Sequence, residues 1–406
     1  MASLDEFEEF VRVKVEVDKC THQQISDELK SSFPGERGFS LRSIERFCSE
    51  KGIKKITNID DQQLDEVISD AVMQVGPTYG RKMMTGLLSS QGVHVNQQRV
   101  KESLCRVAPA YQNARRTDTA RQTNPAPYRA DYVGHKLHLD QNEKLVMYGV
   151  THVAAVDGYS GMIMGFVTMP IKNNVEIYSH LYKPILVQFG LWDQLRVDQG
   201  KEWILTLYIQ ETLAHLRLNT SRAPHLQSTS KQNHIVERIW VEINNRVNYP
   251  IKSCLIALEE AGDIEMACPH VQFCVSWFTI RVANVGITLA VEAWNNHPIP
   301  GGRAVPRQAV VNGNQAIQID STVIPEADDA VQQFQSAGGQ LTIFNCFGED
   351  PLQCNPALVT QREMDFFHYH ANFSDFFNTV VNGDYTLFRE GVLCFLDISR
   401  HLCTLL

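Results

Sequence analysis

The sequence predicts an α/β core with a mixed five-stranded sheet flanked by helices, preceded by an all-α region and followed by an α+β tail. Two observations predict this class. Between about residues 135 and 248, alternating and amphipathic stretches follow one another in the order β-β-β-α-β-α-β-α. Before residue 107, apolar residues recur at helical spacing only.

Composition and length describe a globular protein with a substantial core. The 406 residues are 44% hydrophobic and 20% charged, enough for two or three domains. We find no apolar run near the ~18–20 residues that span a bilayer, so no membrane partner is expected. The acidic start, Met1–Glu9, lacks the features of a signal peptide, and the ten cysteines contain no Cys-x-x-Cys pair. We therefore expect an intracellular protein with buried free thiols.

The net charge of −9 is unevenly distributed along the chain. From residue 311 onward there are 12 acidic and 3 basic residues, so the preceding residues are neutral overall. Between Tyr79 and Ala130, 9 basic residues face 2 acidic ones. A local basic stripe can neutralise phosphates whatever the charge of the whole chain.

The first domains are predicted to be helical. Residues 1–35 form a helical preamble of unknown role, and residues 36–107 form a helical region. In its first part, Ser40 is an expected N-cap and Gly52 an expected helix end. The exposed face of that helix carries Arg42, Ser43 and Arg46, which suits either a recognition helix or a packing helix.

A helix over 61–75 is followed by a helix-turn-helix pattern over 79–104, with its turn at Gly92 and an N-cap at Asn96. The second helix of such a pair can enter the major groove of DNA. A purely structural helical pair is the alternative. The expected DNA contacts are Arg81, Lys82, Gln97, Gln98, Arg99 and Lys101, although one of the last four could point inward.

Residues 108–130 form a basic linker that contains Arg115 and Arg116. Its proline and polar residues argue against a packed element. The linker could follow the DNA backbone or act as a solvated tether.

The core is predicted over residues 131–310. Asp157-Gly158-Tyr159-Ser160-Gly161 is expected to close a hairpin, and Pro184 to kink a helix. The expected strands are 135–142, 147–157, 161–169, one ending at Asp198 and one near 216–220, and the expected helices are 174–190, 203–215 and 232–248.

Three carboxylates in this core are candidates for one site: Asp140 on the first strand, Asp198 after a later strand and Glu237 on the following helix. Spacings of 58 and 39 residues allow them to meet. Carboxylates suit hard cations such as Mg²⁺ and Mn²⁺, and paired metals can cleave a phosphodiester.

Other polar residues compete for these roles. Asp157 could replace Asp140, but an Asx role in the hairpin turn is favoured. Asp193 would point elsewhere on its strand, and Glu242 would face away from Glu237. His138 shares a strand face with Asp140, either as a substrate contact or, with more support, as a packed core histidine.

The segments HLDQNEKL, AVDGYSG, RVDQGKEW, NHIVERIW and AWNNHPI resemble the catalytic core of retroviral-type integrases and transposases. This DDE superfamily has a ribonuclease H-like fold, and the likeness to transposon-derived integrase core-domain proteins covers about residues 130–300. The segment at 79–104 also resembles the helix-turn-helix units of insertion-sequence transposases.

The resemblance implies divalent-metal-dependent DNA cleavage and strand transfer with two Mg²⁺ or Mn²⁺ ions. Asp140 would bridge both ions, while Asp198 and Glu237 would each complete one site. DNA would be the partner, and a homo-oligomer is expected because two DNA ends must be joined. Retroviral integrases carry an N-terminal His/Cys zinc module, whose spacing is absent here, so no zinc is predicted.

The chain also departs from the family. Many relatives read ERLWRDV where this chain has Val241 in place of the basic residue. Arg222, Lys231 and Arg238 are expected DNA contacts that could compensate, as could Lys201. The alternative function is a catalytically inactive, host-retained DNA-binding or protein-interaction module. A nuclease for RNA–DNA hybrids has no positive support. We expect a nuclear location, and for the acidic domain at 311–406 a packing role or a protein partner.

Overall fold

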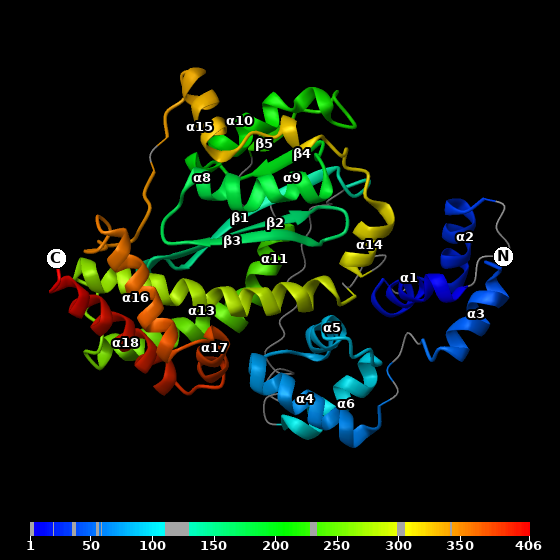
Figure 1. Cartoon of the computed structure of the whole chain (residues 1–406), viewed down its shortest axis with the longest axis horizontal. Helices are drawn as coiled ribbons and strands as arrows, with labels where there is room; N and C mark the ends of the chain where they lie inside the picture. The colour runs from blue at the N-terminus through cyan, green and yellow to red at the C-terminus, as the bar shows by residue number, and fades with distance from the viewer. Residues whose placement is uncertain are drawn as a thin grey trace.

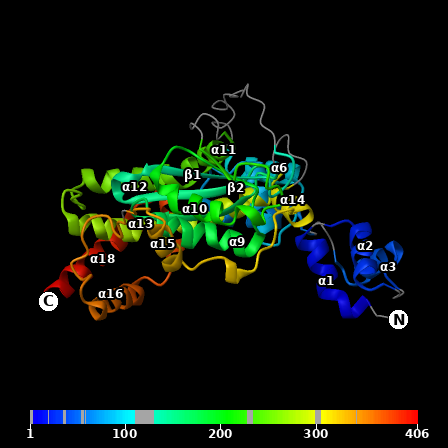
Figure 2. The same ribbon diagram turned by 90° about the horizontal axis from the view of Figure 1, so that it is seen from above.

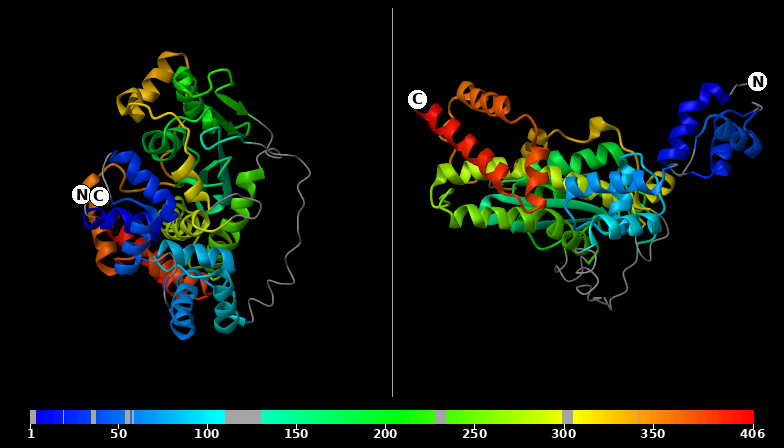
Figure 3. Two further views of the ribbon diagram at one scale, coloured as in Figure 1. Left: turned by 90° about the vertical axis from the view of Figure 1, so that its right-hand side faces the viewer. Right: turned by 90° about the horizontal axis from the view of Figure 1, so that it is seen from below.

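The computed structural model describes residues 4–18, 20–34, 38–53, 57, 59–109, 130–227, 234–298, 305–341 and 343–406. A five-stranded sheet lies at its centre. Figures 1 and 2 place α1–α3 at one end of the molecule and α16–α18 at the other. Figure 3 shows the same arrangement from two further sides.

The N-terminal part is helical, as predicted. Ser40 caps α3 by accepting the Ser43 N–H at 3.2 Å, and Asn96 caps α6 by accepting the Gln98 N–H at 2.7 Å. Between α5 and α6, Gly92 has a φ of 83°, which favours glycine. The elements are η1 (Leu4–Phe7), α1 (Glu8–Arg12), the π-helix η2 (Val13–Val17), α2 (His22–Ser32), α3 (Leu41–Glu50), α4 (Asp61–Val75), α5 (Arg81–Ser90) and α6 (Gln97–Val107).

Two hydrophobic clusters divide this part of the chain. One joins η1–α2 to α3 and spans both sides of residue 35. The other joins α4–α6 to the sheet, α11–α13 and α16–α18. The helix-turn-helix pair therefore shares its core with the centre of the molecule.

The sheet has the strand order β3-β2-β1-β4-β5. The pairs β1–β2 and β2–β3 are antiparallel, whereas β1–β4 and β4–β5 are parallel. The strands are β1 (Lys136–Leu145), β2 (Val150–Asp157), β3 (Ile163–Met169), β4 (Gln194–Val197) and β5 (His225–Gln227).

Side chains alternate between the two faces of the sheet. Ala154 and Val156 pack on the side of α11 and α13, whereas Val153 and Ala155 pack on the side of α8–α10. The elements that follow the strands are η3 (Val146–Tyr148), α8 (Asn174–Ile177), the π-helix η4 (Tyr178–Tyr182), α9 (Lys183–Phe189), η5 (Lys201–Trp203), α10 (Ile204–Thr212), η6 (Ala214–Leu216), α11 (His234–Ile243), the π-helix η8 (Asn244–Asn248), α12 (Tyr249–Glu260) and α13 (Pro269–Asn295).

The fifth strand was predicted in the wrong place. Residues 214–216 form the short helix η6, and the strand begins at His225. Arg217 organises the intervening turn, because its guanidinium donates to the carbonyls of Ala214, Asp193 and Arg222. The bond to Asp193 joins segments 24 residues apart, and none of these contacts leaves a periodic signal in the sequence.

The predicted β-structure of the tail is also wrong, because the described residues from 311 onward contain helices and only isolated bridges. Polar and apolar residues alternate from Asp384 to Phe388, as in a strand, but this stretch begins a helix. Asp384 accepts the Thr386 N–H at 2.9 Å, and Phe388 packs against Phe278. The elements are α14 (Pro306–Gly313), η9 (Ser321–Val323), α15 (Ala327–Ser336), α16 (Pro356–Tyr369), α17 (Phe373–Val381) and α18 (Thr386–Cys403).

Helix α13 is long and apolar enough to cross a membrane by length and composition, which the sequence reading overlooked. In the structure, 61% of its most apolar window is buried, against α5, α17 and α18 among others. It has the surroundings of a core helix. All ten cysteines are free, but Cys105 and Cys354 are exposed rather than buried.

We predict that Gly86→Ala destabilises the protein by about 1–3 kcal/mol, because the added methyl group would overpack the contact between α5 and α13. A Cβ at Gly86 would lie 2.0 Å from the Ala293 carbonyl oxygen. Urea unfolding measures the change. The matched control is Gly313→Ala, where no atom lies within 4 Å of the added carbon. Equal unfolding midpoints for the two variants would contradict the packing argument.

Candidate active site

The parallel pairing of β1 with β4 brings Asp140 and Asp198 to the same level. Lys136 pairs with Gln194, Leu137 with Leu195 and His138 with Arg196, an offset of 58 residues each time. Asp140 lies on β1, and Asp198 directly follows β4 with the same offset. The 58-residue spacing between Asp140 and Asp198 therefore equals the offset at which β1 pairs with β4.

Helix α11 covers the face of β1 that carries Asp140. Asp140 is opposite Ala154 in the antiparallel pair, so both point toward α11 and α13. Trp240 on α11 donates its indole N–H to Asp140 Oδ2 at 3.1 Å, and the Gln141 N–H donates to Oδ1 at 2.9 Å. Since Trp240 follows Glu237 by three residues, the same turn of α11 brings Glu237 toward β1.

Glu237 lines an open pocket of about 390 Å³ beside β1. The α11–η8 side of the pocket is formed by residues three or four apart on one helix face. The β1 side is formed by the four residues that follow Asp140. The lining residues are Gln141, Asn142, Glu143, Lys144, Glu237, Trp240, Val241 and Asn244.

The pKa of Asp140 is raised from 3.8 to about 6. Burial is the largest cause, and the negative charges of Asp198 and Glu237 raise it further. The hydrogen bonds from Gln141 and Trp240 oppose the rise. Both other carboxylates of the trio thus act electrostatically on Asp140.

Asp198 is held by a second tryptophan. Trp203 donates its indole N–H to Asp198 Oδ1 at 2.5 Å. Gly200 lies two residues after Asp198 and is needed for packing. A Cβ at Gly200 would lie 2.3 Å from Glu202 Oε2, so glycine leaves room for the buried Glu202 carboxylate.

A buried network of amides ties α11 and η8 to the sheet. Asn142 donates to Asn244 Oδ1 at 2.9 Å, and Asn248 donates to Asn244 Oδ1 at 2.9 Å and to Asn142 Oδ1 at 3.2 Å. His152 on β2 continues the network to Asn248 and Thr168, both at 3.0 Å. Asn142 lies two residues after Asp140 on the same strand face, so the network positions Glu237 relative to Asp140.

The competing residues have structural roles. The Asp157 carboxylate accepts bonds from Gly134, Ser160 and Trp192, among others, and closes the hairpin as an Asx residue. Asp193 accepts the Tyr132 hydroxyl and the Asn219 N–H.

The remaining two candidates also have other surroundings. Glu242 pairs with Arg246, one turn further along the helix. His138 is fully buried, as expected of a core histidine.

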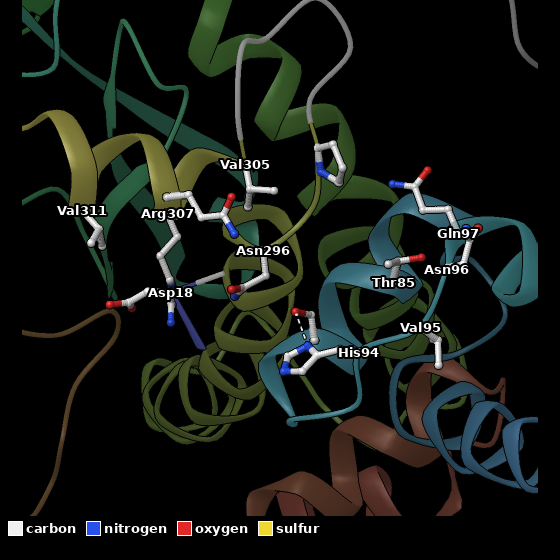
Figure 4. A pocket seen from close by; sticks show the side chains of 13 residues that line it. Asp18, Thr85, His94, Val95, Asn96, Gln97, Asn296, Val305, Arg307 and Val311 are labelled. Carbon is white, nitrogen blue, oxygen red and sulfur yellow. Dashed lines mark hydrogen bonds between the residues drawn. The ribbon is translucent and has the colours of Figure 1, made fainter. Parts of the chain in front are cut away.

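The predicted DNA contacts of α6 are partly engaged within the protein. Arg99 pairs with Asp61 at 2.6 Å and also donates to the Ile59 carbonyl, so this residue points toward α4. Gln98 donates to Glu102 at 2.7 Å. Gln97 lines a pocket of about 300 Å³ with Asn296, which directly follows α13, and with residues of α14 (Figure 4). The start of α6 therefore faces the core domain.

The cations of α5 lie near the catalytic helix. Arg81 is exposed and Lys82 is half-buried. The pKa of Lys82 is lowered, by burial first and then by the charges of Arg81 and Arg238. Arg238, next to Glu237 in sequence, is exposed. The structure thus brings together three predicted contacts that the sequence places far apart.

The other predicted contacts do not join this group. Lys101 is half-buried on α6, and Arg222 pairs with Asp131 at 3.6 Å. Arg115, Arg116 and Lys231 lie outside the described residues, as does most of the predicted linker.

Sequence reasoning missed both indole donors and the amide network. Trp240 follows Glu237 by three residues and Trp203 follows Asp198 by five, a recurring proximity that could have identified the donors. The network joins residues more than 90 positions apart, and no local signal could have found it.

The sheet order β3-β2-β1-β4-β5, with one carboxylate on β1, one directly after β4 and a third on α11, defines a ribonuclease H-like core of the integrase and transposase class. Residues 128–322 match the model of a family described as integrase core domain, and this part of the chain belongs to that family. No curated protein matches the chain.

We predict that Asp140→Asn stabilises the metal-free protein at about pH 8 by on the order of 1–2 kcal/mol relative to wild type. The folded-state pKa of Asp140 is raised, so its stabilising contribution is present below pH about 4 and is lost as pH rises through about 6. The variant cannot ionise and escapes this loss. Urea unfolding in chelator across this range measures it.

The control for this pH experiment is Asp70→Asn, an exposed aspartate on α4. Its stability difference from wild type should not change with pH over the same range. An Asp140→Asn difference that is equally flat would show that Asp140 has no raised pKa.

We also predict that Asn244→Leu costs about 1–3 kcal/mol of stability, because two buried amide donors lose their acceptor. Adding Asn142→Leu should cost less than the sum of the single variants, with a coupling of about 1 kcal/mol. Urea unfolding of the four proteins gives the coupling. The exposed Asn245→Leu is the matched control, and strict additivity would contradict a shared network.

Proposed function

We propose that this chain binds DNA and catalyses divalent-metal-dependent DNA cleavage and strand transfer, with Asp140, Asp198 and Glu237 as the metal ligands. The observation that carries the proposal is that the β1–β4 register sets Asp140 and Asp198 at the same level, with α11 bringing Glu237 toward β1, so that both neighbours act on the charge of Asp140. Three neighbouring carboxylates in an integrase core are an oxygen donor set that suits Mg²⁺ or Mn²⁺.

Asp140, Asp198 and Glu237 have the oxygen atoms and the negative charge that such ions require, but the three carboxylates are not arranged around one point in this structure. Among the described residues, no three His, Cys, Asp or Glu side chains are gathered closely enough to hold one ion. Asp140 and Asp198 are each held by an indole N–H instead. Each indole N–H uses one lone pair of one oxygen, so both carboxylates keep free lone pairs with which to bind a cation.

When bound, two such ions would activate water or a 3′-hydroxyl and stabilise the leaving oxygen. The chain itself contributes alignment and charge. Asp140 must lose its proton to bind a cation, so activity should rise with pH through about 6. Lys144 lines the pocket beside Glu237 and offers a cation to the DNA backbone.

The second candidate function is a non-catalytic DNA-binding or protein-interaction module. Val241 favours it: this side chain is 57% exposed and lines the pocket where many relatives have a basic residue. If the chain is catalytic despite Val241, Lys144 and Arg238 are the cations near Glu237 on which DNA contact would depend.

We further propose a nuclear location and a homo-oligomer that joins two DNA ends. For the acidic residues 311–406 we propose a protein partner. The proposal of a protein partner is supported by exposed apolar side chains on α16, where Met364 is 61% and Tyr369 is 68% exposed.

We predict that wild-type protein binds Mn²⁺ and nicks plasmid DNA, and that Asp140→Asn loses both. Calorimetry and gel assays on the same samples measure the two activities. Asp70→Asn is the control and should keep both, since this exposed aspartate on α4 is not one of the three carboxylates of the site. Absence of Mn²⁺ binding by wild type would overturn the catalytic proposal and leave the module.

Mn²⁺ binding without nicking would point to a weak grip on DNA. In that case Val241→Arg should tighten duplex binding by about 5-fold at 0.15 M salt, the contribution of one phosphate contact, and restore cleavage.

A further inference from the structure

The helix-turn-helix pair is fixed to the core rather than tethered to it. Gly86 on α5 lies so close to α13 that a Cβ would come within 2.0 Å of the Ala293 carbonyl oxygen. On the other side, α4 is fastened to α17: Asn382 donates to the Met73 carbonyl at 2.8 Å, and a Cβ at Gly76 would lie 2.7 Å from the Val381 oxygen. Contacts on two sides give the pair one orientation relative to the core.

The pair also contacts the catalytic helix. The buried ring of Tyr79, just before α5, lies under the Arg246 guanidinium at 5.0 Å, and Arg246 pairs with Glu242. Arg238, Glu242 and Arg246 are spaced four residues apart and so follow one stripe of α11 and η8. The helix-turn-helix pair therefore docks on this stripe.

A neighbouring stripe of the same helix faces the active-site pocket. Glu237, Val241 and Asn244 line that pocket. One helix thus carries the catalytic carboxylate on one stripe and supports the helix-turn-helix pair on the next. The distance between the two functions is a helix width, about 10 Å.

Three cations lie along this junction. Arg81 and Lys82 begin α5 directly after Tyr79, and Arg238 begins the supporting stripe. Within the described residues, none of the three is in an ion pair. On α6, Arg99 pairs with Asp61 and Arg106 with Asp65, whereas Lys101 is half-buried and belongs to no ion pair of the described residues. The unpaired cations nearest to Glu237 are therefore those of the junction.

We infer that Arg81, Lys82 and Arg238 form one phosphate-binding ridge, and that a DNA duplex bound by the helix-turn-helix pair enters the active site of the same chain. The inference rests on the proposed function. It adds that the helix-turn-helix pair and the active site that act on one DNA duplex belong to the same chain, which we call delivery in cis. The contacts of Gly86 with α13 and of Tyr79 with η8 hold the pair beside the Glu237 of its own chain, which favours delivery in cis.

The first test measures binding of a short duplex by fluorescence anisotropy at several salt concentrations, in the Asp140→Asn protein so that no DNA is cut. Arg81→Ala, Lys82→Ala and Arg238→Ala should each lower the slope of log affinity against log salt by about 1. Arg400→Ala, at the far C-terminal helix, is the control. An unchanged slope for Arg238→Ala would overturn the ridge.

The second test mixes two defective proteins. Asp140→Asn lacks a catalytic ligand, and the Arg81→Ala/Lys82→Ala double variant should bind DNA on the order of 30-fold more weakly at 0.15 M salt. The two are co-expressed with different tags, and complexes that contain both are purified. Delivery in cis predicts no recovery of nicking. Recovery toward half the wild-type rate overturns it, since one chain would then present DNA to another.

The two tests separate this inference from the proposed function. Wild-type protein that never nicks DNA would defeat the catalytic proposal, while the salt dependence would still decide whether the ridge exists. Active wild type with restored mixtures would keep the catalytic proposal and defeat delivery in cis.

Discussion

The parallel pairing of β1 with β4 is the constraint on which the site depends. Its register is 58 residues, and this offset alone sets Asp140 beside the residue that follows β4. A shift of one residue would turn Asp140 to the opposite face of the sheet, away from α11. The buried alternation of Leu137 and Leu139 on the far face prevents such a shift, because both would lose their apolar surroundings.

The site concentrates negative charge where burial makes it costly. The charges of Asp198 and Glu237 act on Asp140, which is held by hydrogen bonds from Trp240 and Gln141. These bonds offset part of the penalty, and the raised pKa shows that they do not remove it. Functional sites commonly hold charged groups in arrangements that shift their pKa values and lower the stability of the folded protein. The amide network around Asn244 and Asn248 supplies the stiffness that keeps α11 in place despite the repulsion.

Helix α11 links the candidate site, the helix-turn-helix pair and the core. Glu237 and Trp240 of α11 line the pocket, and Arg246 on the following η8 supports Tyr79 and the helix-turn-helix pair. Beneath it, α13 contacts α5, α11, α17 and α18, so the helical regions before and after the core share one hydrophobic cluster. The acidic C-terminal helices therefore help to hold the helix-turn-helix pair in place.

The sequence by itself determined the order of the elements in the core and the caps of α3 and α6, because periodicity and capping are written in contiguous residues. Tertiary structure decided which of the predicted cations are paired within the protein: Arg99 is paired with Asp61, whereas Arg81, Lys82 and Arg238 lie close enough to influence one another. It also decided the position of β5, the indole donors to Asp140 and Asp198, and the helical tail. Each of these features depends on the packing of surfaces from different parts of the chain. Contacts between residues far apart in the sequence leave no local pattern from which they could be predicted.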